Sequence, residues 1–281
     1  MIEFWKYHGI GNDFVVIDGT KADPGLTPEQ IAFLCDRNFG IGSDGVIYVN
    51  PGMDGSDVTM RIFNTDGTEP EMCGNGVRCL AKHAYDFGIV KSPDFVIHTG
   101  KGNLGAHCTL GADGKVDSVR IDMGAPILDP PSVPVKGDGD RVIDREIEIA
   151  GVKVHINAVS MGNPHCVMFD DLSDEDVERL GPIIEAGREL FPNKVNVEFA
   201  KVTDGKIDIR VFERGVGWTL ACGTGACATT TAAALNGLVP FDEPVPVHLP
   251  GGDLRITVSK TLDRVLMDGP ARLVYRGEIE L

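Results

Sequence analysis

Two cysteines stand at positions where a thiol could act as an acid or a base. Cys73 and Cys222 each directly precede a Gly-x-Gly turn that opens a helix-like run. A thiol at a helix N-terminus feels the positive end of the helix dipole, which lowers its pKa from about 8.5 towards neutrality. The glycines leave the backbone N–H groups unobstructed, so these groups can bind an anion such as a carboxylate. Each cysteine is therefore a candidate proton-transfer group beside a candidate carboxylate site.

Both cysteines belong to an internal duplication. An offset of 149 residues (222 minus 73) places Cys222 on Cys73 and, without a gap, aligns residues 58–63 with residues 207–212. Both segments alternate apolar and other side chains with period two, as half-buried strands do. The helix-like runs after the cysteines align as well. Repetition on this scale predicts two similar domains, each with a strand, a glycine turn and a helix.

Two such units facing each other would suit the inversion of a stereocentre. One group removes a proton from one face of Cα, and a different group returns a proton to the opposite face. One cysteine must then be a thiolate while the other is a thiol, and a first thiolate raises the pKa of the second. Backbone N–H groups that hold the substrate carboxylate would stabilise the developing negative charge.

The order of elements along the chain favours two domains of mixed α and β structure. A chain of 281 residues fits two domains. The boundary is expected near residue 120, where a strand (119–123) begins, and residues 126–139 are expected to form an exposed loop rich in Pro, Gly and Asp. Helices are expected at residues 27–37, 173–180 and 182–190.

Composition excludes several classes of protein. The formal net charge of −16 argues against a nucleic-acid-binding protein. The first residues lack the pattern of a secretory signal, and no run of about 18 apolar residues could span a membrane. We therefore expect a cytoplasmic protein that binds neither nucleic acid nor membrane. The seven cysteines include no C-x-x-C pair, which favours free thiols and argues against a zinc site.

Two glycine-rich segments do not fit nucleotide binding. Residues 40–45 match G-x-G-x-x-G, but they follow a helix-like segment and precede a strand-like one, which is the reverse of a dinucleotide-binding turn. Residues 223–226 lack the Lys-Ser/Thr ending of a phosphate-binding loop.

Six motifs, in chain order, resemble those of the diaminopimelate epimerase family. They are residues 8–14, 63–67, 72–76, 160–165, 213–215 and 221–226. The resemblance extends to residues 269–271. It implies an α+β fold of two pseudo-symmetric domains, each a mixed twisted sheet wrapped around a central helix, with the active site in the cleft between them. The domains would cover residues 1–119, to which a C-terminal segment of about 270–281 returns, and residues 120–269.

The resemblance also implies an activity and a set of site residues. The family are isomerases that epimerise LL-2,6-diaminopimelate to meso-diaminopimelate for lysine and peptidoglycan synthesis, with no cofactor or metal and usually as homodimers. By position, Cys73 and Cys222 would be the acid-base pair, Glu213 would hold the α-amino group, and His165 would tune the thiol pair. The remaining matched positions would bind substrate: Asn12, Asn64, Gly74, Asn75, Asn163, Asn196, Arg214, Gly223 and Thr224. Arg214 suits a carboxylate because guanidinium can bind both oxygens at once.

Two positions differ from the family pattern. Some members have a glutamine that contacts substrate where Gly45 follows Asp44, and many have an acid where Trp218 stands. The second difference concerns local loop packing more than catalysis.

Other interpretations are open at this point. Another two-cysteine racemase, acting on histidine or proline, would use the same chemistry, whereas a related dehydratase has threonine at one cysteine position. A protein that binds amino acids without turnover, or a thiol redox protein that joins Cys73 to Cys222 as a disulfide, would also keep both thiols. Taken singly, the Gly-Asn elements read as turns, and Glu213 with Arg214 reads as a solvated charge pair.

Overall fold

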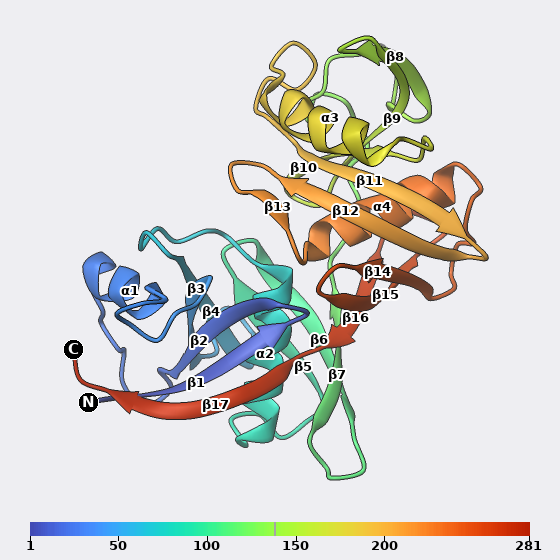
Figure 1. Cartoon of the computed structure of the whole chain (residues 1–281). Coiled ribbons are helices and arrows are strands. Elements are labelled where there is room, and N and C mark those ends of the chain that lie inside the picture. Colours follow the sequence, from blue (N-terminus) through green and yellow to red (C-terminus); the bar gives the residue numbers. More distant parts are fainter. Residues whose placement is uncertain (138) are drawn as a thin grey trace. The chain divides into compact units, whose positions relative to one another are not determined.

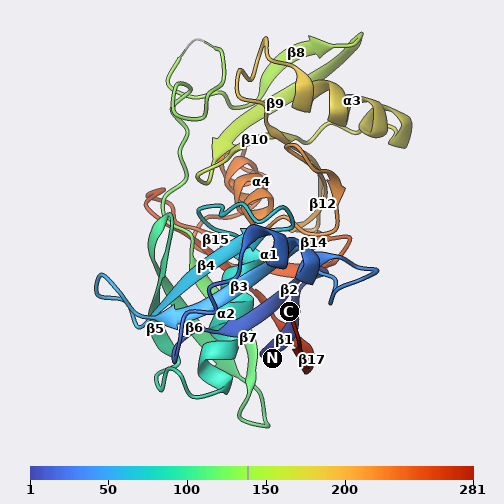
Figure 2. The same ribbon diagram turned by 90° about the vertical axis from the view of Figure 1, so that its left-hand side faces the viewer.

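The computed structural model describes residues 1–137 and 139–281, and the chain divides into two compact units. Unit 1 comprises Met1–Asp122 and Asp268–Leu281, and unit 2 comprises Met123–Met267. Figures 1 and 2 show the chain from two directions. None of the helices in the described ranges has the length and apolar character needed to cross a membrane.

Unit 1 is a mixed sheet with two helices. Its elements are β1 (Ile2–Gly9), β2 (Asn12–Asp18), α1 (Pro28–Cys35), β3 (Gly45–Pro51), β4 (Val58–Asn64), α2 (Gly74–Asp86), β5 (Asp94–Thr99), β6 (Gly102–Leu110), β7 (Val116–Asp122) and β17 (Arg272–Ile279). The strands pair in the order β17–β1–β2–β3–β4–β5–β6–β7. The β2/β3 and β4/β5 pairs are parallel and the others antiparallel. The last strand, β17, therefore brings the C-terminus back beside the N-terminal strand (Figure 1).

Unit 2 repeats this architecture. Its elements are β8 (Arg145–Ile149), β9 (Val152–Ser160), β10 (Pro164–Met168), α3 (Asp174–Ala186), β11 (Asn196–Thr203), β12 (Lys206–Glu213), β13 (Gly217–Thr219), α4 (Gly223–Leu235), β14 (Val245–Leu249) and β15 (Gly252–Val258). The strands pair in the order β8–β9–β10–β11–β12–β14–β15, with β10/β11 and β12/β14 parallel. Parallel and antiparallel strand pairs follow one another in the same order as in unit 1. The predicted α+β fold of two pseudo-symmetric halves is therefore confirmed. Strand β16 (Val265–Pro270) leads the chain from unit 2 back into unit 1.

Each unit has one helix surrounded by strands. In unit 1, α2 contacts β1, β2, β3, β4, β6 and β7. Its residues from Gly74 to Ala84 are buried. In unit 2, α4 contacts β9, β10, β11, β12, β14 and β15. Its Ala- and Thr-rich sequence allows close approach from all sides, and Thr230 and Thr231 satisfy their hydroxyls by donating to carbonyls one turn earlier at 2.9 and 2.8 Å.

The first predicted helix forms but is shorter than expected. Thr27 caps α1, because its hydroxyl accepts from Gln30 N at 3.3 Å while Gln30 Oε1 accepts from Thr27 N at 3.0 Å. Pro28 takes the first helical position, where its missing N–H costs nothing. The helix ends at Cys35, two residues before the expected end.

The two helices expected around Pro182 are a single helix, α3. Ser173 caps its start, and Pro182 lies inside it. The buried stripe of Val177, Leu180 and Ile184 runs without interruption into the core of unit 2. Pro182 is on the exposed side, where water can reach the carbonyl that its missing N–H leaves free. Packing of the buried stripe therefore outweighs the break that proline predicts.

The prediction of an exposed loop at residues 126–139 is wrong in part. Val133 and Val135 are buried in the core of unit 2, together with Val142. Pro-, Gly- and Asp-rich composition marked the turns here correctly but gave no sign of the two valines' packing. Asp138 lies outside the described residues.

Candidate functional site

Cys73 is the N-cap residue of α2. Its extended backbone (φ −137°, ψ 119°) leads into the glycines of the first helical turn. A methyl group at Gly76 would lie 3.0 Å from Ile47 Cδ1, so glycine lets the helix start pack closely against β3. The thiol is half-buried and contacts Asn12 Oδ1 at 3.6 Å. The sequence therefore places this thiol at a helix N-terminus, as the Cys-Gly-x-Gly pattern predicts.

A chain of amides connects Cys73 to a buried arginine. Asn12 Oδ1 also accepts from Asn75 Nδ2 at 3.1 Å, and Asn75 Oδ1 accepts from Arg78 Nη2 at 2.9 Å. Arg78 is fully buried and also donates to the carbonyl of Pro270 at 3.3 Å. The guanidinium thereby fixes which end of the Asn75 amide faces Asn12.

Asp44 completes this network on its other side. Asn12 Nδ2 donates to Asp44 Oδ2 at 2.8 Å, and Arg37 Nη2 donates to Asp44 Oδ1 at 2.8 Å. The neighbouring Gly45 has no room for a side chain, because a methyl group there would stand 2.5 Å from the carbonyl oxygen of Phe63. A glutamine could not be accommodated at position 45 without moving β4.

Asn64 lies apart from that network in the described part of the chain. It ends β4, is exposed, and donates from Nδ2 to Thr68 Oγ1 at 2.9 Å. Within the described residues, no hydrogen bond joins it to Cys73, Asn12 or Asn75.

Cys222 is the N-cap residue of α4 and occupies the place that Cys73 has in unit 1. It is 5% exposed, and Gly225 N donates to its Sγ at 3.3 Å. The Thr224 hydroxyl lies 3.6 Å from the same sulfur. A methyl group at Gly225 would lie 2.9 Å from Glu198 Oε1 and 3.1 Å from Cys222 Sγ, so only glycine fits here.

A hydrogen-bonded chain leads from Thr224 into the core of unit 2. Asn163 Nδ2 donates to Thr224 Oγ1 at 3.3 Å, and His165 Nε2 lies 3.1 Å from Asn163 Oδ1. His165 Nδ1 lies 2.6 Å from Glu198 Oε1. His165 and Glu198 are both fully buried.

Glu213 ends β12 and is a second carboxylate near Cys222. Its Oε1 accepts from Thr219 Oγ1 at 2.5 Å. Burial raises the pKa of Glu213, and the hydrogen bonds from Thr219 and Cys222 oppose that rise. Glu213 is thus a half-buried anion that a positively charged group would stabilise.

Asn196 and Arg214 are joined through the backbone. Asn196 Oδ1 accepts from Arg214 N at 2.9 Å, and Asn196 Nδ2 donates to the Pro164 carbonyl at 2.9 Å. Asn196 therefore links the backbone of Arg214 to that of Pro164 through the two ends of its amide. Arg214 Nη1 contacts the Asn193 carbonyl at 3.4 Å. In the described ranges no carboxylate pairs with the Arg214 guanidinium, which leaves it able to bind one.

The expectation that a helix N-terminus would lower the thiol pKa is wrong for Cys222. Burial raises the pKa of this thiol well above its ordinary value, and the charges of Glu213 and Glu198 raise it further. The hydrogen bonds from Thr224 and Gly225 lower it, but they do not outweigh burial. In the absence of substrate, Cys222 is therefore the protonated thiol.

The other cysteines are buried thiols, as expected. They are Cys35, Cys79, Cys108, Cys166 and Cys227. Burial raises the pKa of Cys79 to about 12 and that of Cys108 to about 12. Such thiols are inert at neutral pH.

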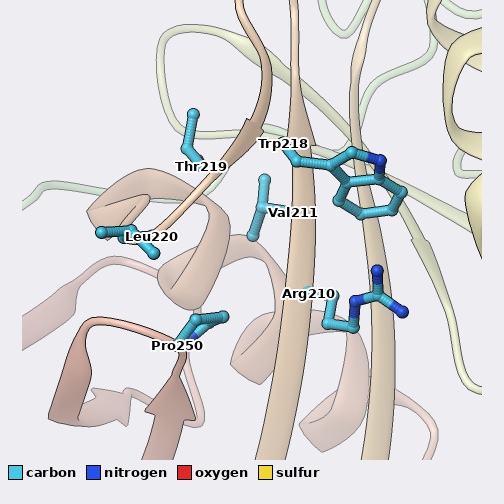
Figure 3. Close-up of a pocket in the computed structure, with 6 residues that line it drawn as sticks. All are labelled: Arg210, Val211, Trp218, Thr219, Leu220 and Pro250. Carbon is cyan, nitrogen blue, oxygen red and sulfur yellow. The ribbon is translucent and has the colours of Figure 1, made fainter.

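A shallow cavity lies on unit 2 at the strand that carries Glu213. Its volume is ≈ 190 Å³, and it is lined by Arg210, Val211, Trp218, Thr219, Leu220 and Pro250 (Figure 3). The Arg210 guanidinium lies 4.7 Å from the Trp218 ring centre. Trp218 also packs edge-on against Phe212, with ring centres 5.3 Å apart. Trp218 is thus part of the packing of β12 and β13, and neither cysteine lines this cavity.

Sequence reasoning missed four residues that contact the predicted ones: Asp44, Arg78, Glu198 and Thr219. Asp44 lies within the glycine-rich segment 40–45, and Arg78 lies two residues after the motif at residues 72–76. Their closeness to these segments could have marked them as site residues. Glu198 stands between the apolar residues Val197 and Phe199 of β11, and that contrast with its immediate neighbours was the only hint. Thr219 had no distinguishing pattern.

Comparison with known proteins identifies one family. The family model for diaminopimelate epimerase matches residues 4–128 and 157–274. The diaminopimelate epimerase of Leptospira biflexa is 50% identical over 100% of this chain and 99% of its own length. The chloroplastic diaminopimelate epimerase of Oryza sativa subsp. japonica is 44% identical over 98% of this chain and 79% of its own length.

Solved structures share the fold at low identity. A phenazine biosynthesis protein of the PhzF family from Bacillus anthracis has a TM-score of 0.72 at 18% identity and covers 100% of this chain and 99% of its own. A probable proline racemase from Agrobacterium radiobacter K84 has a TM-score of 0.71 at 17% identity and covers 100% and 93%. At such identities the likeness concerns the fold alone.

Proposed function

Since the chain belongs to the diaminopimelate epimerase family and is an isomerase, we propose that it converts LL-2,6-diaminopimelate to meso-diaminopimelate with Cys73 and Cys222 as its two proton-transfer groups. The observation that carries the mechanism is that both cysteines cap equivalent helices, α2 and α4, in two halves of the same topology. The reaction would serve lysine and peptidoglycan precursor synthesis and would need no cofactor.

The proton balance requires opposite states of the two thiols. One cysteine, as thiolate, takes the proton from Cα and becomes a thiol. The other, as thiol, gives its proton to the opposite face of Cα and becomes a thiolate. After one turnover the two sulfurs have exchanged states, and the reverse reaction starts from that pair. Because burial and nearby carboxylates keep Cys222 protonated without substrate, we assign the proton donor of the first half-reaction to Cys222 and the base to Cys73.

The carbanion formed at Cα is the difficult species. The backbone N–H groups of Gly74, Asn75, Gly223 and Thr224 would bind the adjacent carboxylate and stabilise its developing charge. Glu213 would hold the α-ammonium group, which also supplies the positive charge that a half-buried carboxylate lacks.

The far end of the substrate carries a second ammonium and a second carboxylate. Arg214 would bind that carboxylate with two parallel hydrogen bonds. The amides of Asn12, Asn64, Asn163 and Asn196 would complete the recognition. Asn196 acts here through the backbone of Arg214, which it holds in place.

We also place the protein in the cytoplasm as a homodimer. Leu273, Val274 and Tyr275 follow one another on β17 and are 40%, 57% and 44% exposed. Three neighbouring large apolar side chains on a strand suit an interface with a second copy. Sedimentation analysis should show a dimer that Val274→Asp dissociates, and a wild-type monomer would contradict the assignment.

Proton NMR in D₂O tests the proposed reaction. Reduced protein is mixed with LL-diaminopimelate, and histidine and proline serve as parallel substrates. Deuterium should enter Cα as the meso isomer appears, with no added cofactor and no exchange in the other two amino acids. Exchange in histidine or proline alone would keep the two-thiol chemistry and overturn the substrate. Absence of exchange in all three would favour a binding or redox role.

A further inference from the structure

The two halves differ in charge at one pair of equivalent positions. In unit 1, Phe14 and Ile47 lie on the parallel strands β2 and β3. An offset of 151 residues (163 minus 12) maps these strands onto β10 and β11, where His165 takes the place of Phe14 and Glu198 that of Ile47. An ionisable pair in unit 2 thus replaces an apolar pair, so the fold itself does not require charges here.

Glu198 is costly to bury without a positively charged partner. The side chain has no exposure, and its Oε2 has no hydrogen-bond donor among the described residues. Its Oε1 lies 2.6 Å from His165 Nδ1. A buried carboxylate is tolerated when a cation compensates it, and His165 is the group placed to do so.

The other nitrogen of His165 also faces an acceptor. Its Nε2 lies 3.1 Å from Asn163 Oδ1, while Asn163 Nδ2 donates to Thr224 Oγ1 at 3.3 Å. Two acceptors at the two ring nitrogens require a hydrogen on each, so this arrangement holds an imidazolium. Since the Thr224 oxygen already receives a hydrogen from Asn163, its own hydroxyl hydrogen is available to Cys222 Sγ at 3.6 Å.

We propose that Glu198 is a positioning residue that keeps His165 protonated, so that Asn163 and Thr224 direct a hydroxyl hydrogen towards the Cys222 sulfur. The thiolate then has two donors, the Thr224 hydroxyl and Gly225 N–H. With a neutral His165, Nε2 becomes an acceptor and the Asn163 amide turns its NH₂ towards it. The Asn163 oxygen then takes the Thr224 hydrogen, and the thiolate keeps only the Gly225 donor.

The remaining titratable groups around this chain are Glu213, Cys166 and Cys222. Glu213 on β12 interacts electrostatically with both His165 and Glu198. Burial raises the pKa of the Cys166 thiol on β10, and the charge of Glu198 raises it further. With His165 charged, the two carboxylates and the imidazolium leave one net negative charge beside Cys222. The ammonium group that we assign to Glu213 would neutralise that charge.

Alkylation of the free protein by iodoacetamide tests the positioning role. The rates at Cys222 and Cys73 are followed by mass spectrometry at several pH values in wild type and Glu198→Gln. Loss of one hydrogen bond to a charged group should slow Cys222 by about tenfold, while Cys73 serves as the internal control and keeps its rate. If Glu198 acted only as a repelling charge, its removal would speed Cys222. Faster or unchanged alkylation therefore overturns the proposal.

Three further variants guard against a folding artefact. Glu198→Asp retains the anion and should restore part of the Cys222 rate. Thr224→Val removes the hydroxyl alone and should slow Cys222 as Glu198→Gln does. The double variant His165→Phe with Glu198→Ile installs the apolar pair of unit 1, keeps the core filled, and should also slow Cys222. A wild-type Cys222 rate in the folded double variant would contradict the proposal.

The catalytic consequence of this inference rests on the proposed epimerisation, but the alkylation experiment uses no substrate. Slow Cys222 alkylation in Glu198→Gln, together with an inert wild type in the NMR experiment, would overturn the function and keep the positioning role. If instead the wild type is active in the NMR experiment and Cys222 of Glu198→Gln alkylates at the wild-type rate, the positioning role is overturned and the proposed function is kept.

Discussion

Gly225 and Glu198 are in direct contact across the start of α4: a methyl group on Gly225 would stand 2.9 Å from Glu198 Oε1. The equivalent Gly76 of unit 1 faces an apolar group, because the same methyl would meet Ile47 Cδ1 at 3.0 Å. The two halves thus share a backbone arrangement at their cysteines and differ in the chemistry beneath it.

Replacing these glycines by alanine should separate packing from chemistry. Gly225→Ala and Gly76→Ala each overpack a helix start, so each should lower the free energy of unfolding by about 1–3 kcal/mol. Gly225→Ala also displaces Glu198 and the Cys222 sulfur, and a displacement near 1 Å should reduce kcat by about 100-fold. Thermal melts and kcat check both. Equal losses of kcat in the two variants would contradict a special role for the Glu198 contact.

Sequence reasoning located what depends on local pattern. The strand, Cys-Gly-x-Gly turn and helix recur at an offset of 149 residues (222 minus 73), and β4 with α2 matches β12 with α4 at that offset. The role of Glu198 was not predicted, because it depends on burial and on a partner 33 residues away along the chain. A local sequence pattern contains neither kind of information. The same limit explains the wrong expectation for the Cys222 pKa, where burial outweighs the helix N-terminus.

Serine in place of either cysteine should abolish most epimerisation. A hydroxyl is far less acidic than a thiol, so Cys73→Ser and Cys222→Ser should each reduce kcat/KM by about 1,000-fold or more in both directions. The measurement is proton NMR from each isomer, with alkylation of the remaining cysteine as a check of folding. Near-normal turnover in either single variant would refute the two-thiol assignment.

Neutralising Glu213 should make Cys222 more reactive in the free protein. The charge of Glu213 helps to raise the pKa of the Cys222 thiol, so Glu213→Gln lowers that pKa and increases the thiolate fraction at a given pH. Alkylation of Cys222 at pH 8 should become several-fold faster, whereas Cys73 in the same chain should be unaffected. This change is opposite in sign to that expected for Glu198→Gln. An unchanged Cys222 rate would show that Glu213 does not act on the thiol.

Changing Arg214 should weaken substrate binding more than catalysis. Arg214→Gln removes a charged two-point contact with the distal carboxylate, so KM should rise by about 10- to 100-fold with a smaller fall in kcat. Arg214→Lys keeps the charge without the planar geometry, so its KM should lie between those of the wild type and Arg214→Gln. Steady-state kinetics over a range of diaminopimelate concentrations provides both constants. A fall in kcat at constant KM would place Arg214 at the reacting end instead.

His83 should make unit 1 sensitive to mild acid. Its ring is fully buried, its Nδ1 lies 3.3 Å from the Tyr7 hydroxyl, and burial lowers its pKa to about 4. As the pH falls below the ordinary value of about 6.5, the unfolded chain binds a proton that the folded chain excludes. The folded state should therefore lose about 3 kcal/mol of stability between pH 6.5 and 4 through this residue alone, and nothing further at lower pH. Denaturant unfolding of wild type and His83→Phe across that range isolates the effect, because carboxylate titrations are common to both. Parallel pH dependences in the two proteins would contradict it.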